Sequence, residues 1–271
     1  MLYIVDDNQS RETSLSLYRY VCHHVVGTEE TVRTRRMLNI IRDNLCKSKV
    51  FTQITSGSGG EGLDMKGSDI DIMYVYKDVH VYEDMHSARV NAAETCVGMK
   101  MENNKLGFTH LRLLRCKSNT ILKMCTKVGN YLYLSSPLCK SNIIRMGCHA
   151  DVVHGPCLSD KYGYFEFAYT LHSRSWISIT NQWVTISNSS WPSSDVKSQI
   201  IDHSVLFVPI GSKGFRNEHI EWRISFSVGE KLLIYSFTQT QLLCYALVKI
   251  LIKDVVNRDS RCKDLIYSFY I

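Results

Sequence analysis

The sequence has no apolar run long enough to cross a bilayer, for which about 18 consecutive residues are needed. Its most apolar stretch, residues 242–252, is interrupted by Lys249. Residues 1–12 lack both the basic start and the apolar core of a secretory signal. We therefore expect neither a membrane partner nor secretion, and we predict a cytoplasmic protein, with the nucleus as an alternative compartment.

The ten cysteines form no C-x-x-C pair and have no regular spacing, so nothing in the sequence indicates a disulfide framework. We interpret them as reduced thiols, as in proteins of the cytosol. Hydrophobic residues make up 45% of the 271 positions and charged residues 21%, which is the balance of a folded chain rather than a disordered one. The formal net charge of +6 suits a polyphosphate or nucleic-acid partner but does not establish one.

The segment 13–47 has the apolar spacing of one long helix or of a kinked pair. Gly27 and Thr28 mark the expected kink, since Thr28 is a favourable N-cap for a helix that begins at Glu29. The apolar stripe consists of Tyr18, Val21, Val25, Val32, Leu38, Ile41 and Leu45. The opposite face carries Arg33, Arg35, Arg36 and Arg42. Two interpretations of this basic face stay open: contact with a nucleic-acid backbone, or a solvated helix surface.

Strands and helices are mixed in the first two thirds of the chain and helices dominate the end, which predicts an α+β fold. The expected strands are 51–55, 68–76, 96–102, 109–114, 164–172 and 205–209, and the expected late helices are 227–237, 238–256 and 260–271. We place a core lobe at 13–217 and a helical lobe at 218–271. The helical lobe stops in mid-helix at Ile271, as a truncated lobe would.

A glycine-rich segment, residues 56–62, separates the first two expected strands, and we predict it to be a loop. Glycine lets backbone N–H groups approach phosphate oxygens closely. Asp69 and Asp71 follow on the next strand, where a period of two places both carboxylates on one face. Adjacent carboxylates repel each other unless they share a cation, and hard oxygen ligands suit Mg²⁺ or Mn²⁺. Either element alone is usually a turn or a solvated face, but their order along the chain favours a metal and nucleotide site.

Further motifs accompany this arrangement, and together they resemble a known family. They are Gly57-Ser58, Glu61-Gly62-Leu63, Ser68-Asp69-Ile70-Asp71, Val26-Gly27-Thr28-Glu29, Gly107-Phe108-Thr109, Gly155-Pro156, Trp176, Trp191-Pro192, Val208-Pro209-Ile210-Gly211 and Glu221-Trp222-Arg223-Ile224-Ser225-Phe226-Ser227. Over residues 13–271 the chain resembles the cyclic GMP–AMP synthase (cGAS)-like receptors and the related Mab-twenty-one-like proteins, of the invertebrate type. The resemblance implies a nucleotidyltransferase-fold mixed sheet with a long N-terminal spine helix and a C-terminal helical lobe.

The resemblance also implies a catalytic set of three acids that hold two Mg²⁺ or Mn²⁺ ions. Asp69 and Asp71 match two of them. Counting back from Trp176, the third position falls on Glu166, where family members usually carry aspartate. Glutamate keeps the charge, but its extra methylene displaces the carboxylate, and a misplacement of about 1 Å can cost about a hundredfold in rate. A solvent-facing carboxylate on a strand is the alternative interpretation of Glu166.

Nucleotide-binding residues are implied in both lobes by the same resemblance. They are Gly57, Ser58, Arg223, Ser225, Ser227, Lys249, Ser268 and Phe269. Arg223 would bind phosphates in bidentate fashion, or else form a surface ion pair. Ser227 is alternatively an N-cap paired with Glu230, and Lys249 is alternatively a lysine whose stem lies along an amphipathic helix. Phe269 stands where the family has a tyrosine that stacks on a base.

The implied activity joins ATP and GTP, or either alone, into a cyclic dinucleotide second messenger of innate immune sensing, with double-stranded RNA or DNA as the activator. The alternative is a catalytically silent protein of the same fold that binds nucleotide or a protein partner. The departures at Glu166 and Phe269 favour the silent protein, and the intact pair Asp69 and Asp71 favours the enzyme. We predict no zinc, because the expected helical lobe contains no cluster of His and Cys.

Overall fold

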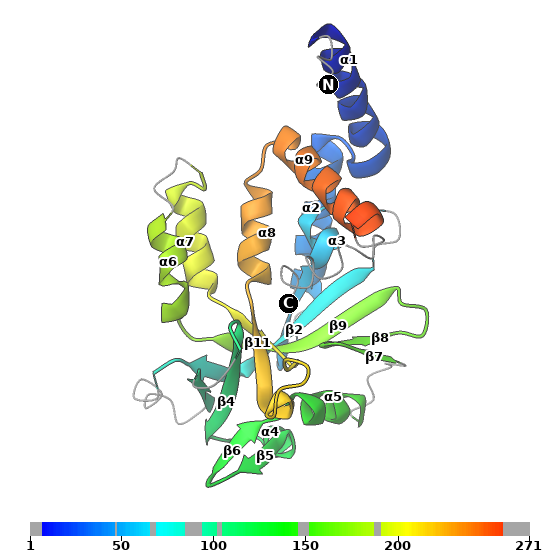
Figure 1. Cartoon of the computed structure of the whole chain (residues 1–271). Coiled ribbons are helices and arrows are strands. Elements are labelled where there is room, and N and C mark those ends of the chain that lie inside the picture. Colours follow the sequence, from blue (N-terminus) through cyan, green and yellow to red (C-terminus); the bar gives the residue numbers. More distant parts are fainter. Residues whose placement is uncertain are drawn as a thin grey trace.

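A computed structural model describes residues 7–46, 48–65, 69–84, 94–101, 105–145, 152–186 and 191–256. The fold is α+β, with a long N-terminal helical arm, a mixed sheet, and further helices in the last part described (Figure 1). Among these residues, no helix combines the length and the apolar character that a membrane crossing requires. The eight cysteines in the described part of the chain are all free thiols.

The N-terminal arm is a kinked pair of helices. It consists of α1 (Asp7–Val21), the π-helical turn η1 (Cys22–Val26) and α2 (Glu29–Leu45). Gly27 has a φ of 103°, and the Thr28 side chain accepts a hydrogen bond from the backbone N–H of Thr31 at 3.3 Å. The kink and its cap are therefore confirmed at Gly27 and Thr28, because glycine adopts the positive φ and threonine satisfies a free N–H of the new helix.

The sheet is mixed. Its strands are β1 (Phe51–Ser56), β2 (Ile70–Tyr82), β3 (Thr95–Lys100), β4 (Phe108–Arg115), β5 (Cys125–Val128), β6 (Tyr131–Leu134), β7 (Val152–His154), β8 (Cys157–Ser159), β9 (Phe165–Ser173), β10 (Leu206–Val208) and β11 (Glu221–Ser225). They are ordered β1-β2-β3-β4-β11-β10-β9-β8-β7, and β2 also pairs with β9. This extra pairing closes β2, β3, β4, β11, β10 and β9 into a six-stranded barrel. The pairs of β2 with β3 and with β9 are parallel.

The barrel has an apolar core to which each of its six strands contributes a buried side chain: Val81, Val97, Leu111, Leu171, Phe207 and Trp222. The Trp222 indole donates a hydrogen bond to the carbonyl of Leu134 at 3.0 Å, so its polar atom is satisfied inside the core. Burial of a side chain such as Phe207 stabilises the fold by about 1.5–3 kcal/mol. The closed barrel is therefore the rigid frame on which the candidate site is built.

The remaining helices flank the sheet. They are α3 (Gly57–Glu61), α4 (Asn119–Lys123), α5 (Ser136–Arg145), η3 (Ser178–Thr180), α6 (Asn181–Ile186), α7 (Ser194–His203), η4 (Glu218–Ile220), α8 (Ser227–Tyr235), α9 (Gln239–Ile250) and η5 (Leu251–Val256). The two helices expected over 227–256 are confirmed, and the expected helix 260–271 lies outside the described residues. A second apolar cluster joins Val26 and Val32 of the arm to Leu242 and Ala246 of α9, so segments far apart in sequence pack together (Figure 1).

Two sequence expectations about the elements are wrong. The segment Glu221–Ser225, which we expected to open the helical lobe, is β11 and lies in the barrel between β4 and β10. The glycine-rich segment is the short helix α3 rather than a loop. In both cases the contacts of the segment with distant parts of the chain decide its local structure, and a single sequence does not show these contacts.

The expected apolar stripe of α2 is also wrong over its second half. Leu38, Ile41 and Leu45 are 55%, 46% and 80% exposed, whereas Val32 and Asn39 are buried. The face that α2 turns inward is mostly polar because it contacts the backbone of α3, as described below.

Candidate metal centre

Three carboxylates gather where β2 and β9 run side by side. Asp71 of β2 is the register partner of Glu166 of β9 in the parallel pair, and Asp69 lies just before β2. One ligand oxygen from each of Asp69, Asp71 and Glu166 lies within 4.8 Å of the others. The position counted from Trp176 therefore brings Glu166 to the two aspartates. All three residues are half-buried.

The electrostatics of this acidic triad (Asp69, Asp71 and Glu166) favour a bound cation. Burial, followed by the neighbouring charges of Asp69 and Glu166, raises the pKa of Asp71 from 3.8 to about 6. The charge of Lys249 opposes this rise in the pKa only in part. A divalent cation would relieve the repulsion and the desolvation together. Three hard oxygen donors fit Mg²⁺ or Mn²⁺, which was the expected metal.

Gly57 is needed where α3 meets the triad. Its φ is +61°, and a Cβ added there would lie 1.8 Å from Oδ2 of Asp71. Any other residue would displace that carboxylate or move the backbone. At Gly59, by contrast, a Cβ would meet nothing within 4 Å, so α3 leaves open space there. The close approach of α3 to Asp71 therefore depends on Gly57.

The carbonyl groups of α3 are held by side chains from two other helices. Asn39 of α2 donates from Nδ2 to the carbonyl of Gly59 at 2.7 Å, and the Tyr235 hydroxyl of α8 donates to that of Gly60 at 2.8 Å. Arg36 of α2 donates from Nε to the carbonyl of Glu61 at 2.9 Å. Carbonyl groups in the last turn of a helix can accept hydrogen bonds from side chains, so polar side chains on α2 stabilise α3 better than apolar ones. This explains the polar inward face of α2.

Ser58 and Lys249, two of the expected nucleotide-binding residues, are in direct contact. Lys249 of α9 donates to the Ser58 hydroxyl at 3.0 Å and to the Glu61 carboxylate at 2.8 Å. The Tyr245 hydroxyl donates to the other oxygen of Glu61 at 2.9 Å. Lys249 therefore does not simply lie along an amphipathic helix. Glu61 and Tyr245 position its ammonium beside α3.

Ser225 and Ser227 lie on the triad's side of β2. Ser225 donates to the Ser227 hydroxyl at 3.1 Å, and Ser227 donates to the sulfur of Met73 at 3.2 Å. Met73 shares a strand face with Asp71, because side chains two apart on a strand point the same way. The alternative of Ser227 as an N-cap paired with Glu230 is wrong: α8 is capped by Phe226, without a side-chain hydrogen bond.

Arg223 and Cys157 complete the surroundings of the triad. Burial, together with the carboxylates of Glu166 and Asp71 and against the charge of Arg223, raises the pKa of the Cys157 thiol to about 12. A side-chain hydrogen bond joins Cys157 to Glu166. Burial also raises the pKa of Glu230, and the positive charges of Arg223 and Lys249 oppose that rise. The sequence analysis missed Cys157, because only the pairing of β8 with β9 brings it to Glu166.

The four arginines of α2 do not form one basic surface. Arg35 donates to the carbonyl of Val26 at 2.5 Å and lies 3.5 Å from Asp64, and Arg36 stacks on the Tyr235 ring at 4.4 Å. Arg33 and Arg42 are exposed. Contacts with α3, Tyr235 and the kink thus hold two of the four guanidinium groups, and contact of this face with a nucleic-acid backbone stays a prediction. The expected residues Ser268 and Phe269 lie outside the described residues.

No protein-family model matches the chain, and a search of curated proteins finds no match. The case for function therefore rests on the residues of the chain and on the site they form.

Proposed function

We propose that this protein is a nucleotidyltransferase that uses two Mg²⁺ or Mn²⁺ ions held by Asp69, Asp71 and Glu166. The observation that carries the proposal is the convergence of the three carboxylates, within 4.8 Å of one another, on paired parallel strands. Bound metal ions activate an attacking hydroxyl and stabilise the leaving pyrophosphate. The protein's own part is to hold the three acids in place.

The phosphate groups of the substrate are assigned to the side of the triad where α3 and α9 meet. Ser58 supplies a hydroxyl and Lys249 an ammonium group there, 3.0 Å apart. Glu61 already neutralises part of the Lys249 charge, so a triphosphate would share this cation rather than neutralise an unpaired one. Arg223, Ser225 and Ser227 are assigned to the same nucleotide, because Ser227 bonds Met73 on the strand face that carries Asp71.

The product class follows from the sequence resemblance. The segment Glu221–Ser227 and the order of Gly57-Ser58 and Asp69/Asp71 favour a synthase that joins ATP and GTP, or either alone, into a cyclic dinucleotide of innate immune signalling. Double-stranded RNA or DNA as the activator stays a prediction.

A catalytically silent protein that binds nucleotide is the second candidate function. One observation favours it: Glu166, where the family usually has aspartate, is hydrogen-bonded to the half-buried Cys157 thiol. That contact gives one carboxylate of the triad a second partner, on β8, which a bound metal ion would have to share.

The two candidates are separated by incubating purified protein with radiolabelled ATP and GTP, Mg²⁺ or Mn²⁺, and duplex DNA or RNA. The enzyme is expected to give a labelled product that disappears in the Asp69→Asn/Asp71→Asn double variant. Asp78→Asn is the matched control, since Asp78 is an exposed carboxylate on the same strand. Metal-dependent stabilisation by nucleotide without product identifies the silent protein. If the protein gives no product and shows no metal-dependent stabilisation by nucleotide, both candidate functions are overturned.

A further inference from the structure

The turn between β8 and β9 carries two tyrosines that the proposed function does not use. Tyr162 and Tyr164 are each 67% exposed, more than any other tyrosine in the described part of the chain. Their ring centroids lie 5.9 Å apart, with an angle of 32° between the ring planes. The Lys161 ammonium lies 4.7 Å from the centroid of the Tyr162 ring. Aromatic rings gain much from contact, so two neighbouring rings left in water form a surface that a planar ligand can cover.

The turn that carries these rings is held by Asp160. The Asp160 carboxylate accepts hydrogen bonds from the backbone N–H groups of Tyr164 at 2.8 Å and Phe165 at 3.0 Å. The Asp160 carbonyl accepts another from the N–H of Gly163 at 3.1 Å, and Gly163 has the positive φ of 70° that this turn requires. The rings are therefore presented on an ordered support, which lowers the entropy that a ligand must overcome to bind them.

The strand register places Tyr164 beside the acidic triad. Asp71 of β2 pairs with Glu166 of β9. One step earlier, the backbone N–H of Ile70 donates to the carbonyl of Tyr164 at 3.0 Å, so the ladder extends to Tyr164 and brings it next to Asp69. Tyr164 stands two residues before Glu166, and side chains two apart on a strand lie on the same face. Tyr164 therefore flanks the triad on the β9 side.

α3 and the two tyrosines lie on opposite sides of the triad. At Asp71, β2 pairs with β1 on one side and with β9 on the other. α3 directly follows β1, and the phosphates of the substrate are assigned to it, whereas Tyr164 directly precedes β9. The attacking and leaving oxygens of an in-line displacement lie on opposite sides of the phosphorus. The acceptor nucleotide, which supplies the attacking hydroxyl, therefore belongs on the β9 side.

We propose that Tyr162 and Tyr164 form a stacking platform for the base of this acceptor nucleotide. The proposal rests on the proposed function and adds to it a group that binds a base. Tyr164, beside Asp69, contacts the base, and Tyr162 extends the aromatic surface. Every base has a π-face, so stacking tolerates any of them, and the larger ring system of a purine stacks more strongly.

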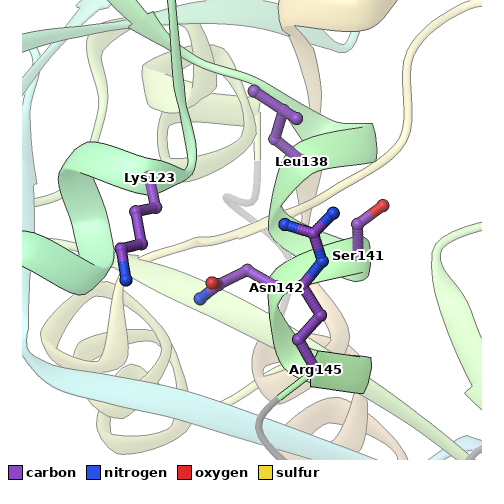
Figure 2. Close-up of a pocket in the computed structure, with 5 residues that line it drawn as sticks. All are labelled: Lys123, Leu138, Ser141, Asn142 and Arg145. Carbon is purple, nitrogen blue, oxygen red and sulfur yellow. The ribbon is translucent and has the colours of Figure 1, made fainter.

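A second surface that attracts anions has to be controlled for in the test. A hollow of about 570 Å³ opens between α4 and α5 and is lined by Lys123, Leu138, Ser141, Asn142 and Arg145. Figure 2 shows Lys123 on α4 facing α5, with the Asn142 amide pointing toward it. Lys123 and Arg145 are exposed. The residues that line this basic hollow include no aromatic side chain, so it can attract a polyphosphate but cannot stack a base.

The test measures binding of 2-aminopurine riboside monophosphate to the full chain, in the presence of Mn²⁺ and saturating tripolyphosphate. Tripolyphosphate fills the phosphate side at α3, and the fluorescence of 2-aminopurine is quenched when it stacks on an aromatic ring. Tyr164→Ala is expected to bind this probe at least about fivefold more weakly, the smallest loss expected when alanine removes a base-stacking ring. Tyr164→Phe keeps the ring and is expected to bind within about twofold of the unmodified protein.

Two control variants separate stacking from other effects. Tyr20→Ala removes an exposed tyrosine of α1, in the arm and away from the sheet (Figure 1), and should bind the probe within about twofold of the unmodified protein. Lys123→Gln/Arg145→Gln removes the cations of the basic hollow and should leave the quenching unchanged. Titration calorimetry with tripolyphosphate should give the same Mn²⁺-dependent affinity for Tyr164→Ala as for the unmodified protein, because the platform holds a base and no phosphate.

The platform is overturned if Tyr164→Ala binds the probe within twofold of the unmodified protein while a thermal melt shows that it is folded. It is also overturned by an equal loss in Tyr20→Ala, by an equal loss of tripolyphosphate affinity in Tyr164→Ala, or by an unmodified protein that binds tripolyphosphate without quenching the probe. In each of these cases Mn²⁺-dependent binding of tripolyphosphate to the unmodified protein leaves the proposed function standing. If the unmodified protein binds neither tripolyphosphate nor the probe, the proposed function and the platform fail together.

Discussion

The acidic triad and the basic hollow are regions of opposite charge that are built in different ways. In the triad, Asp69, Asp71 and Glu166 are half-buried and within 4.8 Å of one another. In the hollow, Lys123 and Arg145 are exposed and come from two helices. Like charges held together away from water cost free energy until a counterion binds, whereas dispersed surface charges are screened by water and salt. The triad therefore depends on a ligand for its stability, and the hollow does not.

The largest effect is expected from Glu166→Gln, which tests whether Glu166 acts as the third ligand. The loss of one carboxylate should weaken Mn²⁺ binding at least about tenfold and lower nucleotide transfer at least about a hundredfold, because a misplaced or lost ligand disturbs both metals. Titration calorimetry with Mn²⁺ gives the first value and product formation the second. Cys157→Ser keeps a hydrogen-bonding group beside Glu166 and is expected to bind Mn²⁺ within about twofold. Unchanged Mn²⁺ binding in Glu166→Gln would show that Glu166 is not a metal ligand and that only Asp69 and Asp71 remain as candidates.

The next effect concerns the closeness of α3 to the triad. Gly57→Ala forces a side chain into a positive φ and against Oδ2 of Asp71, so the free energy of unfolding should fall by about 1–3 kcal/mol and Mn²⁺ binding should weaken. Gly59→Ala is the matched control on the same short helix, where a Cβ meets nothing, and it should be neutral or slightly stabilising. Urea denaturation measures both. Equal losses of stability in the two variants would show that α3 tolerates no replacement of glycine, whether or not the residue contacts Asp71.

The parts of the site that the sequence predicts are those with short-range patterns. Asp69 and Asp71 stand two apart on a strand, and Thr28 stands directly after the glycine that kinks the arm, so local geometry alone places them. The role of Glu166 could be predicted only from the family resemblance, by counting back from Trp176. Cys157 could not be found, because its place beside Glu166 depends on the pairing of β8 with β9.

The errors in the fold have the same cause. Arg36 and Asn39 are polar residues on the inward face of α2, and only the position of α3, some 20 residues later in the chain, explains them. A periodicity argument assigns the apolar residues to the inside and therefore turns the second half of α2 the wrong way. The strand β11 was missed for a similar reason, since its partners β4 and β10 are both distant in sequence.

A pH series on Asp71→Asn without metal sharpens the electrostatic side of the comparison. The pKa of Asp71 is raised from 3.8 to about 6 in the folded protein, so the folded state binds its proton more tightly than the unfolded state does. Stability from this group is therefore lost as the pH rises from about 4 through about 6. The variant lacks this loss and should melt at a higher temperature than the unmodified protein at pH 8, with the difference vanishing near pH 4.

Saturating Mn²⁺ should reverse the order at pH 8, because the metal stabilises only the protein that keeps its ligand. Thermal melts with and without Mn²⁺ give all four values. A variant that melts lower than the unmodified protein at pH 8 without metal would contradict the raised pKa, and an equal gain from Mn²⁺ in both proteins would place the metal elsewhere.

The smallest effect is expected from Lys123→Gln/Arg145→Gln in the hollow, measured without any ligand. Both side chains are exposed, so the free energy of unfolding should change by no more than about 0.5 kcal/mol in urea, at low and at high salt alike. The corresponding pair of substitutions in the triad, Asp69→Asn/Asp71→Asn, should shift it in the stabilising direction at pH 8, because it removes two repelling and partly buried charges. If the hollow variant lost more than about 1 kcal/mol, its cations would be holding α4 and α5 in the fold. The contrast between a triad that is destabilised by its own charges and a hollow whose cations do not contribute to stability would then fail.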